Sequence, residues 1–162
     1  MPDGAFDRAY AIESTEHMAD KPAFFLEAWR TLRPGGRLVV CAWLADPHAS
    51  RLSVRYLLEP ICREGRLPGM GTREDYEAMA CAAGFETVSY DDISRNVRRT
   101  WSICALRVLG RLMSDGRYRK LVLDPSFDNR VFALTIPRLI IAMRTGAMRY
   151  GLFTWQRPVA AC

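Results

Sequence analysis

The sequence predicts an α/β fold in a single domain, and three observations lead to this prediction. Residues 38–43, LVVCAW, are apolar at every position, which is typical of a parallel strand covered on both faces. A strand-like segment precedes them, and a helix-like segment lies between the two. A better-marked helix pattern begins near residue 72 and is followed by another strand pattern. Alternation of this kind predicts a sheet with helices packed against it.

The first part of the chain predicts a strand, a helix and a second strand. Residues 6–12, FDRAYAI, follow a Pro-Asp-Gly turn signal and favour a strand. Apolar side chains at helical spacing predict a helix over 21–32. The helix ends in LRPGG, because Pro34 disfavours helical geometry at Arg33 and Gly35 supplies a positive φ. These segments together predict a right-handed βαβ unit.

The middle of the chain predicts two helices and a third strand. Residues 52–61 have a helical pattern. Thr72 and Asp75 are spaced as in a capping box, so we expect the next helix to begin there and to end at Gly84. Residues 85–93 then favour a strand.

Beyond residue 94 the pattern is mainly helical. Helices are predicted over 101–113 and 126–143, and the second is apolar on nearly all sides and interrupted by Pro137. A last strand is expected over 150–156, YGLFTWQ. No repeat or low-complexity linker separates these segments, which supports one domain.

Composition limits the possible classes of protein. Apolar residues make up 49% and charged residues 25% of the chain, as in soluble globular proteins. No segment resembles a signal peptide, and no apolar run approaches the roughly 20 residues that cross a bilayer, so a cytoplasmic location is expected. The five cysteines are scattered without a Cys-x-x-Cys pair, which argues against a disulfide scaffold or a metal site.

The net charge of +5 comes from an arginine-rich composition. We interpret this bias as codon usage in a GC-rich genome and expect no nucleic-acid partner, because the sequence has no aromatic-interleaved basic ladder and no helix-turn-helix pattern. An anionic substrate or peripheral contact with a membrane surface stays open.

Two carboxylates and a histidine follow the first predicted strand. Glu13, Glu16 and His17 lie in the stretch IESTEH, residues 12–17. In open α/β sheets the ligand crevice lies beyond the carboxyl ends of the strands, where these side chains are expected. The alternative is that Glu16 and His17 only cap or solvate the start of the following helix.

Residues 6–43 carry the closest resemblance to a known family. The segment FDRAYAIESTEHMADKPAFFLEAWRTLRPGGRLVVCAW resembles the middle of the class I S-adenosylmethionine-dependent methyltransferases, in the small-molecule branch with tocopherol, sterol and cyclopropane-fatty-acid types. In that family strand 4 begins with FD and ends in Glu-x-x-Glu-His, and Leu-Arg/Lys-Pro-Gly-Gly leads into strand 5. The resemblance implies a partial Rossmann-like sheet equivalent to strands 4 to 7, the last antiparallel, with residues 94–149 as a helical cap on the acceptor side.

Two cofactor-binding features of that family have no counterpart in this sequence. They are the Gly-rich loop after strand 1 and the acidic residue that ends strand 2. We therefore expect residues 1–162 to be the C-terminal portion of a methyltransferase domain, arising through an internal start, a frameshift or a split gene. Two functions follow: a methyltransferase or a fragment of one, and a non-catalytic half-domain that associates with another polypeptide. An exposed sheet edge would also favour self-association.

The resemblance assigns roles to seven residues. It implies S-adenosylmethionine as the cofactor and a lipophilic small molecule, such as a quinol, sterol, terpenoid or other secondary metabolite, as the acceptor. His17 would act as a base or orient the acceptor, with Glu16 beside it. The cofactor would be held by Ile12 and Glu13, and the acceptor pocket would be lined by Trp43, Trp101 and Phe132. The alternatives are that Trp43 is a core residue and that the helix around Phe132 is an ordinary buried helix.

Overall fold

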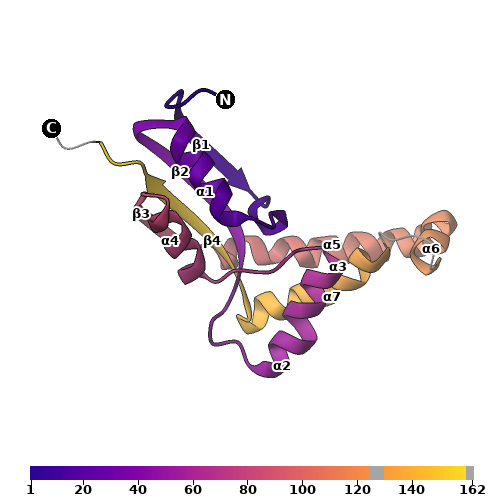
Figure 1. The fold of residues 1–162 in the computed structure, drawn as a ribbon. Coiled ribbons are helices and arrows are strands. Elements are labelled where there is room, and N and C mark those ends of the chain that lie inside the picture. Colours follow the sequence, from indigo (N-terminus) through magenta and orange to yellow (C-terminus); the bar gives the residue numbers. More distant parts are fainter. Residues whose placement is uncertain (125–129, 160–162) are drawn as a thin grey trace.

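The computed structural model describes residues 1–124 and 130–159, without the side chains of residues 121–123 and 130–134. Four strands form one sheet in the order β1-β2-β4-β3 (Figure 1). β1 and β2 are parallel, and β4 is antiparallel to both of its neighbours. The structure thus confirms the predicted α/β fold with an antiparallel last strand. The strands are β1 (Phe6–Ile12), β2 (Leu32–Ala45), β3 (Glu86–Asp92) and β4 (Met148–Gln156).

Helix α1 (Lys21–Thr31) connects the two parallel strands. Its N-cap is Asp20, whose side chain accepts a hydrogen bond from the Ala23 N–H at 2.9 Å. Gly35 has a φ of +80°, as the Pro-Gly turn predicts. β2 begins earlier than expected, because Leu32 already pairs with Phe6 of β1 before the ladder resumes at Arg37.

The helices between β2 and β3 agree with the sequence patterns. α2 (Arg51–Ser53), a π-helical turn η2 (Val54–Leu58) and α3 (Glu59–Glu64) follow one another without a break. α4 (Arg73–Ala82) begins with the predicted capping box, in which the Thr72 and Asp75 side chains each accept from the other residue's backbone N–H. Gly84 ends it with a φ of +96°.

Three described helices lie between β3 and β4 in the chain: α5 (Ser94–Ser114), α6 (Gly116–Leu123) and α7 (Arg130–Thr145). The predicted start of the first at residue 101 is wrong, because Asp92 accepts the Ser94 N–H at 3.0 Å and the helix begins directly after β3. α6 was not predicted. Of the expected helix 126–143, residues 126–129 lie outside the described residues. Within the described ranges, no helix is long and apolar enough to span a membrane.

Two hydrophobic clusters cover the two faces of the sheet. Alternate residues of β2, such as Val40 and Ala42, pack with Phe25 of α1 and Tyr76 of α4. The intervening residues, including Trp43, belong to a second cluster with side chains from η2, α3, α5 and α7. The long helices therefore cover the second face only toward the carboxyl end of β2, and α5 and α6 project away from the sheet as an arm (Figure 1).

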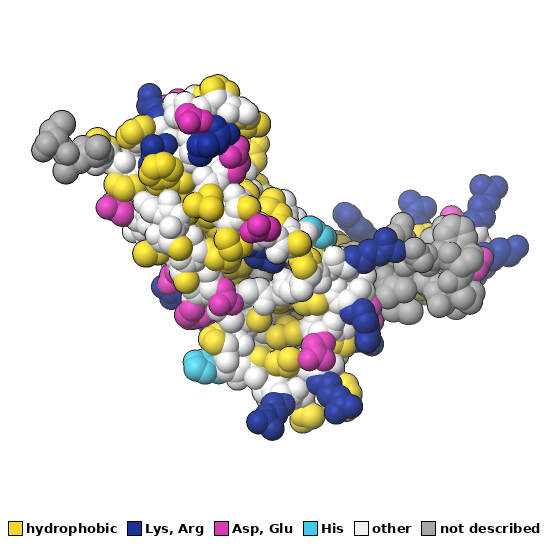
Figure 2. Space-filling model, viewed as in Figure 1, with side chains coloured by type: hydrophobic (Ala, Val, Ile, Leu, Met, Phe, Trp, Pro, Cys, Tyr) yellow, Lys and Arg dark blue, Asp and Glu magenta, His cyan; other side chains and the backbone are white. Residues whose placement is uncertain are grey.

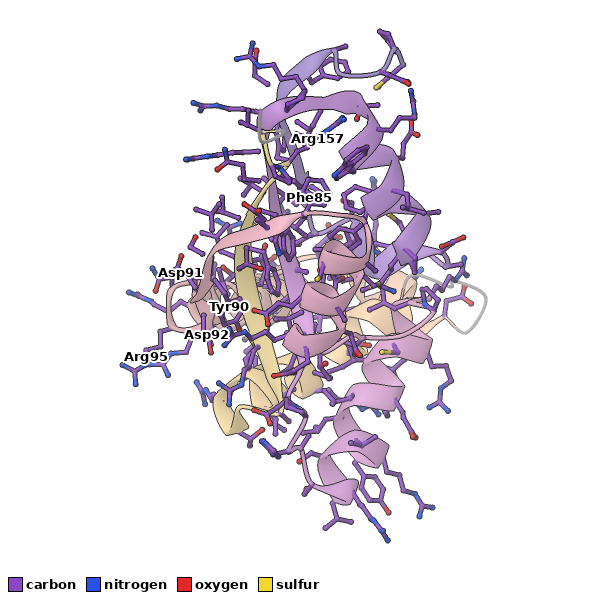
Figure 3. All side chains as sticks on the ribbon, turned by 60° about the vertical axis from the view of Figure 1, so that its left-hand side comes forward. Phe85, Tyr90, Asp91, Asp92, Arg95 and Arg157 are labelled. Carbon is purple, nitrogen blue, oxygen red and sulfur yellow. The ribbon has the colours of Figure 1, made fainter. Side chains whose placement is uncertain are left out.

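At the opposite end of the sheet, the Arg157 side chain, which follows β4, contacts neighbouring elements (Figure 3). Its Nη1 donates to the carbonyl oxygens of Trp29 at 2.8 Å and Leu32 at 2.6 Å. The guanidinium also lies 3.6 Å from the centre of the Trp29 ring. These contacts join the end of α1 and the start of β2 to the last strand.

β1 is an edge strand of the described sheet. Tyr10 is 78% and Ile12 59% exposed, since no described helix covers this part of the second face. Self-association through that edge stays a prediction.

Candidate functional site

The chain turns sharply where β1 ends. The Glu13 N–H still donates to the Cys41 carbonyl oxygen of β2 at 3.0 Å. Glu13 itself has a φ of +48°, a left-handed conformation that is uncommon for a residue other than glycine. A 3-10 turn, η1 (Thr15–His17), follows directly. The predicted acidic stretch is thus a tight turn at the carboxyl ends of the parallel strands.

Two buried side chains fix this turn in place. The Thr15 and Tyr76 hydroxyls form a hydrogen bond of 2.9 Å, which ties the turn to α4. Glu16 is 2% exposed, and its Oε1 accepts from the Trp43 backbone N–H at 2.6 Å, which ties the turn to β2. Because Asp20 is the N-cap of α1, Glu16 does not cap that helix.

The second oxygen of Glu16 has an unusual environment. Among the described residues, Oε2 is buried without a hydrogen-bond partner. Burial raises the pKa of this carboxyl above its ordinary value, although the hydrogen bond from Trp43 lowers it in part. A buried carboxylate oxygen with no partner is costly in a purely structural role, so the atom is available for a ligand.

A cavity of about 190 Å³ adjoins the turn. The indole rings of Trp43 and Trp101 meet edge to face there, with centroids 5.5 Å apart. Trp43 Nε1 is a second buried polar atom without a partner in the part of the chain described. The wall is therefore aromatic with a few polar groups, which is typical of a small-molecule site. The cavity is lined by Glu13, Glu16, His17, Trp43, Gly65, Leu67 and Trp101.

Tyr150 of β4 is a functional candidate that sequence reasoning missed. Its hydroxyl donates to Glu13 Oε1 at 2.9 Å, and its side chain is buried. Burial and this hydrogen bond to a carboxylate both raise the pKa of the Tyr150 phenol, so it stays a donor. Tyr150 pairs with Trp43 across the sheet, so it lies next to a residue that lines the cavity. It holds the Glu13 carboxylate in position.

The structure brings five of the seven predicted residues together around this cavity: Glu13, Glu16, His17, Trp43 and Trp101. His17 is exposed at the rim, whereas Glu16 is buried. Ile12 ends β1, is largely exposed and is not among the lining residues. Phe132 belongs to α7, and its side chain lies outside the described part of the chain.

A second cavity, of about 220 Å³, lies at the same end of the sheet around Asp46, His48 and Tyr90. Arg149 in its wall is paired with two acidic residues of the same wall, because it bonds to Asp46 at 2.7 Å and to Asp92 at 3.2 Å. Tyr90 and Asp92, which are labelled in Figure 3, both belong to β3. None of the predicted site residues lines it. We therefore place the candidate site at the tryptophan-lined cavity.

The fold defines the class of protein. The structure is similar to that of a cyclopropane synthase from Mycobacterium tuberculosis, with a TM-score of 0.78 and 18% identity over 95% of this chain and 56% of that one. It is also similar to geranyl diphosphate C-methyltransferase from Streptomyces coelicolor, with a TM-score of 0.68 and 19% identity over 96% of this chain and 49% of that one. The fold is that of the class I methyltransferases.

The chain belongs to the methyltransferase domain family, whose model matches residues 1–90. This match confirms the resemblance in the sequence. Tocopherol O-methyltransferase from Arabidopsis thaliana is 29% identical over 97% of this chain and 45% of its own length. The 27-O-demethylrifamycin SV methyltransferase from Amycolatopsis mediterranei is 34% identical over 97% of this chain and 54% of its own length. The chain thus spans about half the length of these relatives.

Proposed function

We propose that the chain supplies the acceptor side of an S-adenosylmethionine-dependent methyltransferase for a lipophilic small molecule such as a quinol, sterol, terpenoid or other secondary metabolite. The observation that carries the proposal is the buried Glu16 carboxylate beside a cavity walled by Trp43 and Trp101, with one oxygen that has no partner among the residues described. Two relatives are named as methyltransferases of tocopherol and of 27-O-demethylrifamycin SV. A similar structure, of geranyl diphosphate methyltransferase, is in complex with SAM.

The cofactor would be held in part by this chain. Glu13 lies at the end of a parallel strand, where ligands of open α/β sheets bind, and Tyr150 orients its carboxylate. Ile12 would contribute from the adjoining end of β1. When bound, S-adenosylmethionine supplies an electrophilic methyl group on a sulfonium. The printed chain has no Gly-rich loop, so we expect these residues alone to bind the cofactor weakly.

The proton of an acceptor hydroxyl would pass to a side chain of this site. In the proposed reaction the carbon–sulfur bond breaks, a carbon–oxygen bond forms, and the hydroxyl proton is taken up by the base. Glu16 is the stronger candidate for the base, because burial raises its pKa and its Oε2 needs a partner. His17, at the rim of the cavity, would orient the acceptor.

A second candidate function is a non-catalytic half-domain that associates with another polypeptide. The exposed edge of β1, with Tyr10 and Ile12 uncovered, favours it. The two functions differ in whether the Glu16 cavity takes part in chemistry.

The test joins this chain to the amino-terminal half of the tocopherol relative and measures transfer of a labelled methyl group to a panel of lipophilic hydroquinones and phenols. Glu16→Gln should lower turnover by roughly a hundredfold or more, the usual contribution of a general base. His17→Ala should raise the KM for the acceptor more than it lowers kcat. Glu59→Gln, at an exposed position of α3, is the matched control and should leave both unchanged.

Two results would contradict the proposal. One is a folded chimera that binds S-adenosylmethionine by calorimetry yet methylates none of the acceptors, which would favour the non-catalytic half-domain. The other is full turnover in Glu16→Gln, which would return Glu16 to a structural role. The chain without the fused amino-terminal half gives the background level of methyl transfer.

A further inference from the structure

The positive charge of the chain is concentrated in the arm formed by α5 and α6. Residues 94–123 contain eight basic residues and a single acidic one, which gives this segment a net charge of +7. The rest of the chain carries 15 basic and 17 acidic residues and is slightly negative. Figure 2 shows Lys and Arg side chains standing out along the arm. The net positive charge of the chain is therefore carried by this segment.

The same arm exposes a row of large apolar side chains. Leu106 is 69%, Leu109 54% and Met113 76% exposed, and Ile103 is also exposed one turn earlier. These residues recur every three or four positions, so they lie on one face of α5. An uncovered aliphatic face of this kind marks a contact surface.

The other face of α5 packs on the body of the protein. Val97 and Trp101 join the second hydrophobic cluster, and Trp101 also lines the candidate site. α5 thus holds the site on its inner face and presents the apolar row outward. Arg107 and Arg111 are exposed and interleave with that row in the sequence. At the start of the helix, Figure 3 shows Arg95 pointing away from the ribbon.

The end of the arm is held in a defined shape. Arg119 of α6 folds back, and its Nη1 donates to the carbonyl oxygens of Leu112 and Met113 at 2.8 and 3.1 Å. Asp115, the acidic residue of the segment, accepts the Arg117 N–H at 2.9 Å and so caps α6. The Asp115 carboxylate is therefore engaged by the backbone, and the outward surface stays basic.

We propose that α5 and α6 dock this protein on the surface of an anionic lipid bilayer. The aliphatic row would enter the interface between headgroups and acyl chains, and the flanking arginines would pair with anionic headgroups. A bilayer fits better than an acidic protein or a nucleic acid, because the exposed row is purely aliphatic and thioether, without aromatic stacking residues. The inference goes beyond the proposed function and does not depend on it, since binding needs neither cofactor nor acceptor.

The test is flotation of the full chain with vesicles of phosphatidylcholine containing about 30% phosphatidylglycerol, compared with phosphatidylcholine alone. The anionic vesicles should bind the chain at least tenfold more tightly, and binding should weaken as salt rises. The triple variant Leu106→Gln, Leu109→Gln, Met113→Gln should lose binding to the anionic vesicles at least tenfold. Arg107→Gln with Arg111→Gln should lose roughly fivefold for each arginine.

Two controls separate the arm from general effects on charge and hydrophobicity. Leu26→Gln in α1 and Arg63→Gln in α3 remove one exposed leucine and one exposed arginine elsewhere, and both should bind the vesicles like the parent chain. Thermal melts confirm that each variant is folded. Equal partition of the parent chain onto both kinds of vesicle, or unchanged binding of the triple variant, would overturn the proposal. A parent chain that stays in the soluble fraction would also overturn it, whether or not that chain binds an acidic protein.

Discussion

At the scale of single residues, the site depends on a carboxyl group kept away from water. Glu16 gives one oxygen to the Trp43 backbone and leaves the other without a partner among the described residues. Glu13 is fixed differently, by a hydroxyl donor from β4. Two glutamates three positions apart thus have distinct environments, one buried against the backbone of β2 and one held by a hydroxyl of β4.

Glu16→Gln should change how stability depends on pH. Burial raises the folded-state pKa of Glu16 above its unfolded value, so its contribution to stability is fully present below the unfolded pKa. That contribution is lost as the pH rises through the folded-state pKa. The free energy of unfolding of the parent chain, relative to Glu16→Gln, should therefore fall as the pH rises above 4.5, the ordinary pKa of a glutamate. Urea unfolding at several pH values measures it.

Glu86→Gln, at an exposed position of β3, controls for the loss of one negative charge. A constant difference between the parent chain and Glu16→Gln across the pH range would show that burial of Glu16 does not perturb its titration.

The sequence predicts which residues meet at the site better than it predicts their environments. The motif places Glu13, Glu16 and His17 after a strand, and all three line the cavity. That Glu16 is buried and His17 exposed depends on a short 3-10 turn anchored by Thr15, which has no sequence signature. Tyr150 was missed because it lies 137 positions from Glu13, and the two meet only through the order of the strands.

At the scale of elements, the end of α4 depends on a glycine. Gly84 has a φ of +96°, and a Cβ there would lie 2.9 Å from Trp29 Nε1. Gly84→Ala should destabilise the protein by about 1–3 kcal/mol, because it combines backbone strain with a clash against a packed indole. Chemical denaturation measures the change.

Gly110→Ala in α5 is the matched comparison. A Cβ at Gly110 meets nothing within 4 Å, and the residue is inside a helix. This variant should gain about 0.5–1 kcal/mol from helix propensity alone. Similar effects in the two variants would refute the proposed role of Gly84.

Elements with strong local signals were the predictable ones. The capping box at Thr72 and the Pro-Gly turn at Gly35 lie where the sequence places them. The start of α5 was missed because residues 94–100 are polar apart from Val97, and a helix there depends on its attachment to β3 through Asp92. α6 is short and capped only by Asp115, so its pattern is weak.

At the scale of the whole molecule, the uncovered side of β1 should promote self-association. Unpaired backbone groups at a sheet edge and the exposed Tyr10 and Ile12 side chains favour pairing between copies. Light scattering of the 162-residue chain at about 50 μM should therefore give a mass of at least a dimer. Tyr10→Lys should shift the population toward monomer, because an edge lysine opposes strand pairing.

Leu52→Lys in α2 adds the same charge at another exposed leucine and should leave the mass unchanged. A parent chain that is monomeric at this concentration would show that the edge of β1 does not drive association.

The position of β4 in the sheet has a consequence for how the protein is made. β4 lies between β2 and β3, although it follows both in the chain, and β3 has no other strand partner in the described sheet. Phe153 and Trp155, which are fully buried in the first cluster, also follow every described helix in the chain. Such non-local pairing is slow, so the ladder closes late during biosynthesis. Until then the edges of β2 and β3 that β4 joins stay unpaired, and the nascent polypeptide is the form most in need of a chaperone.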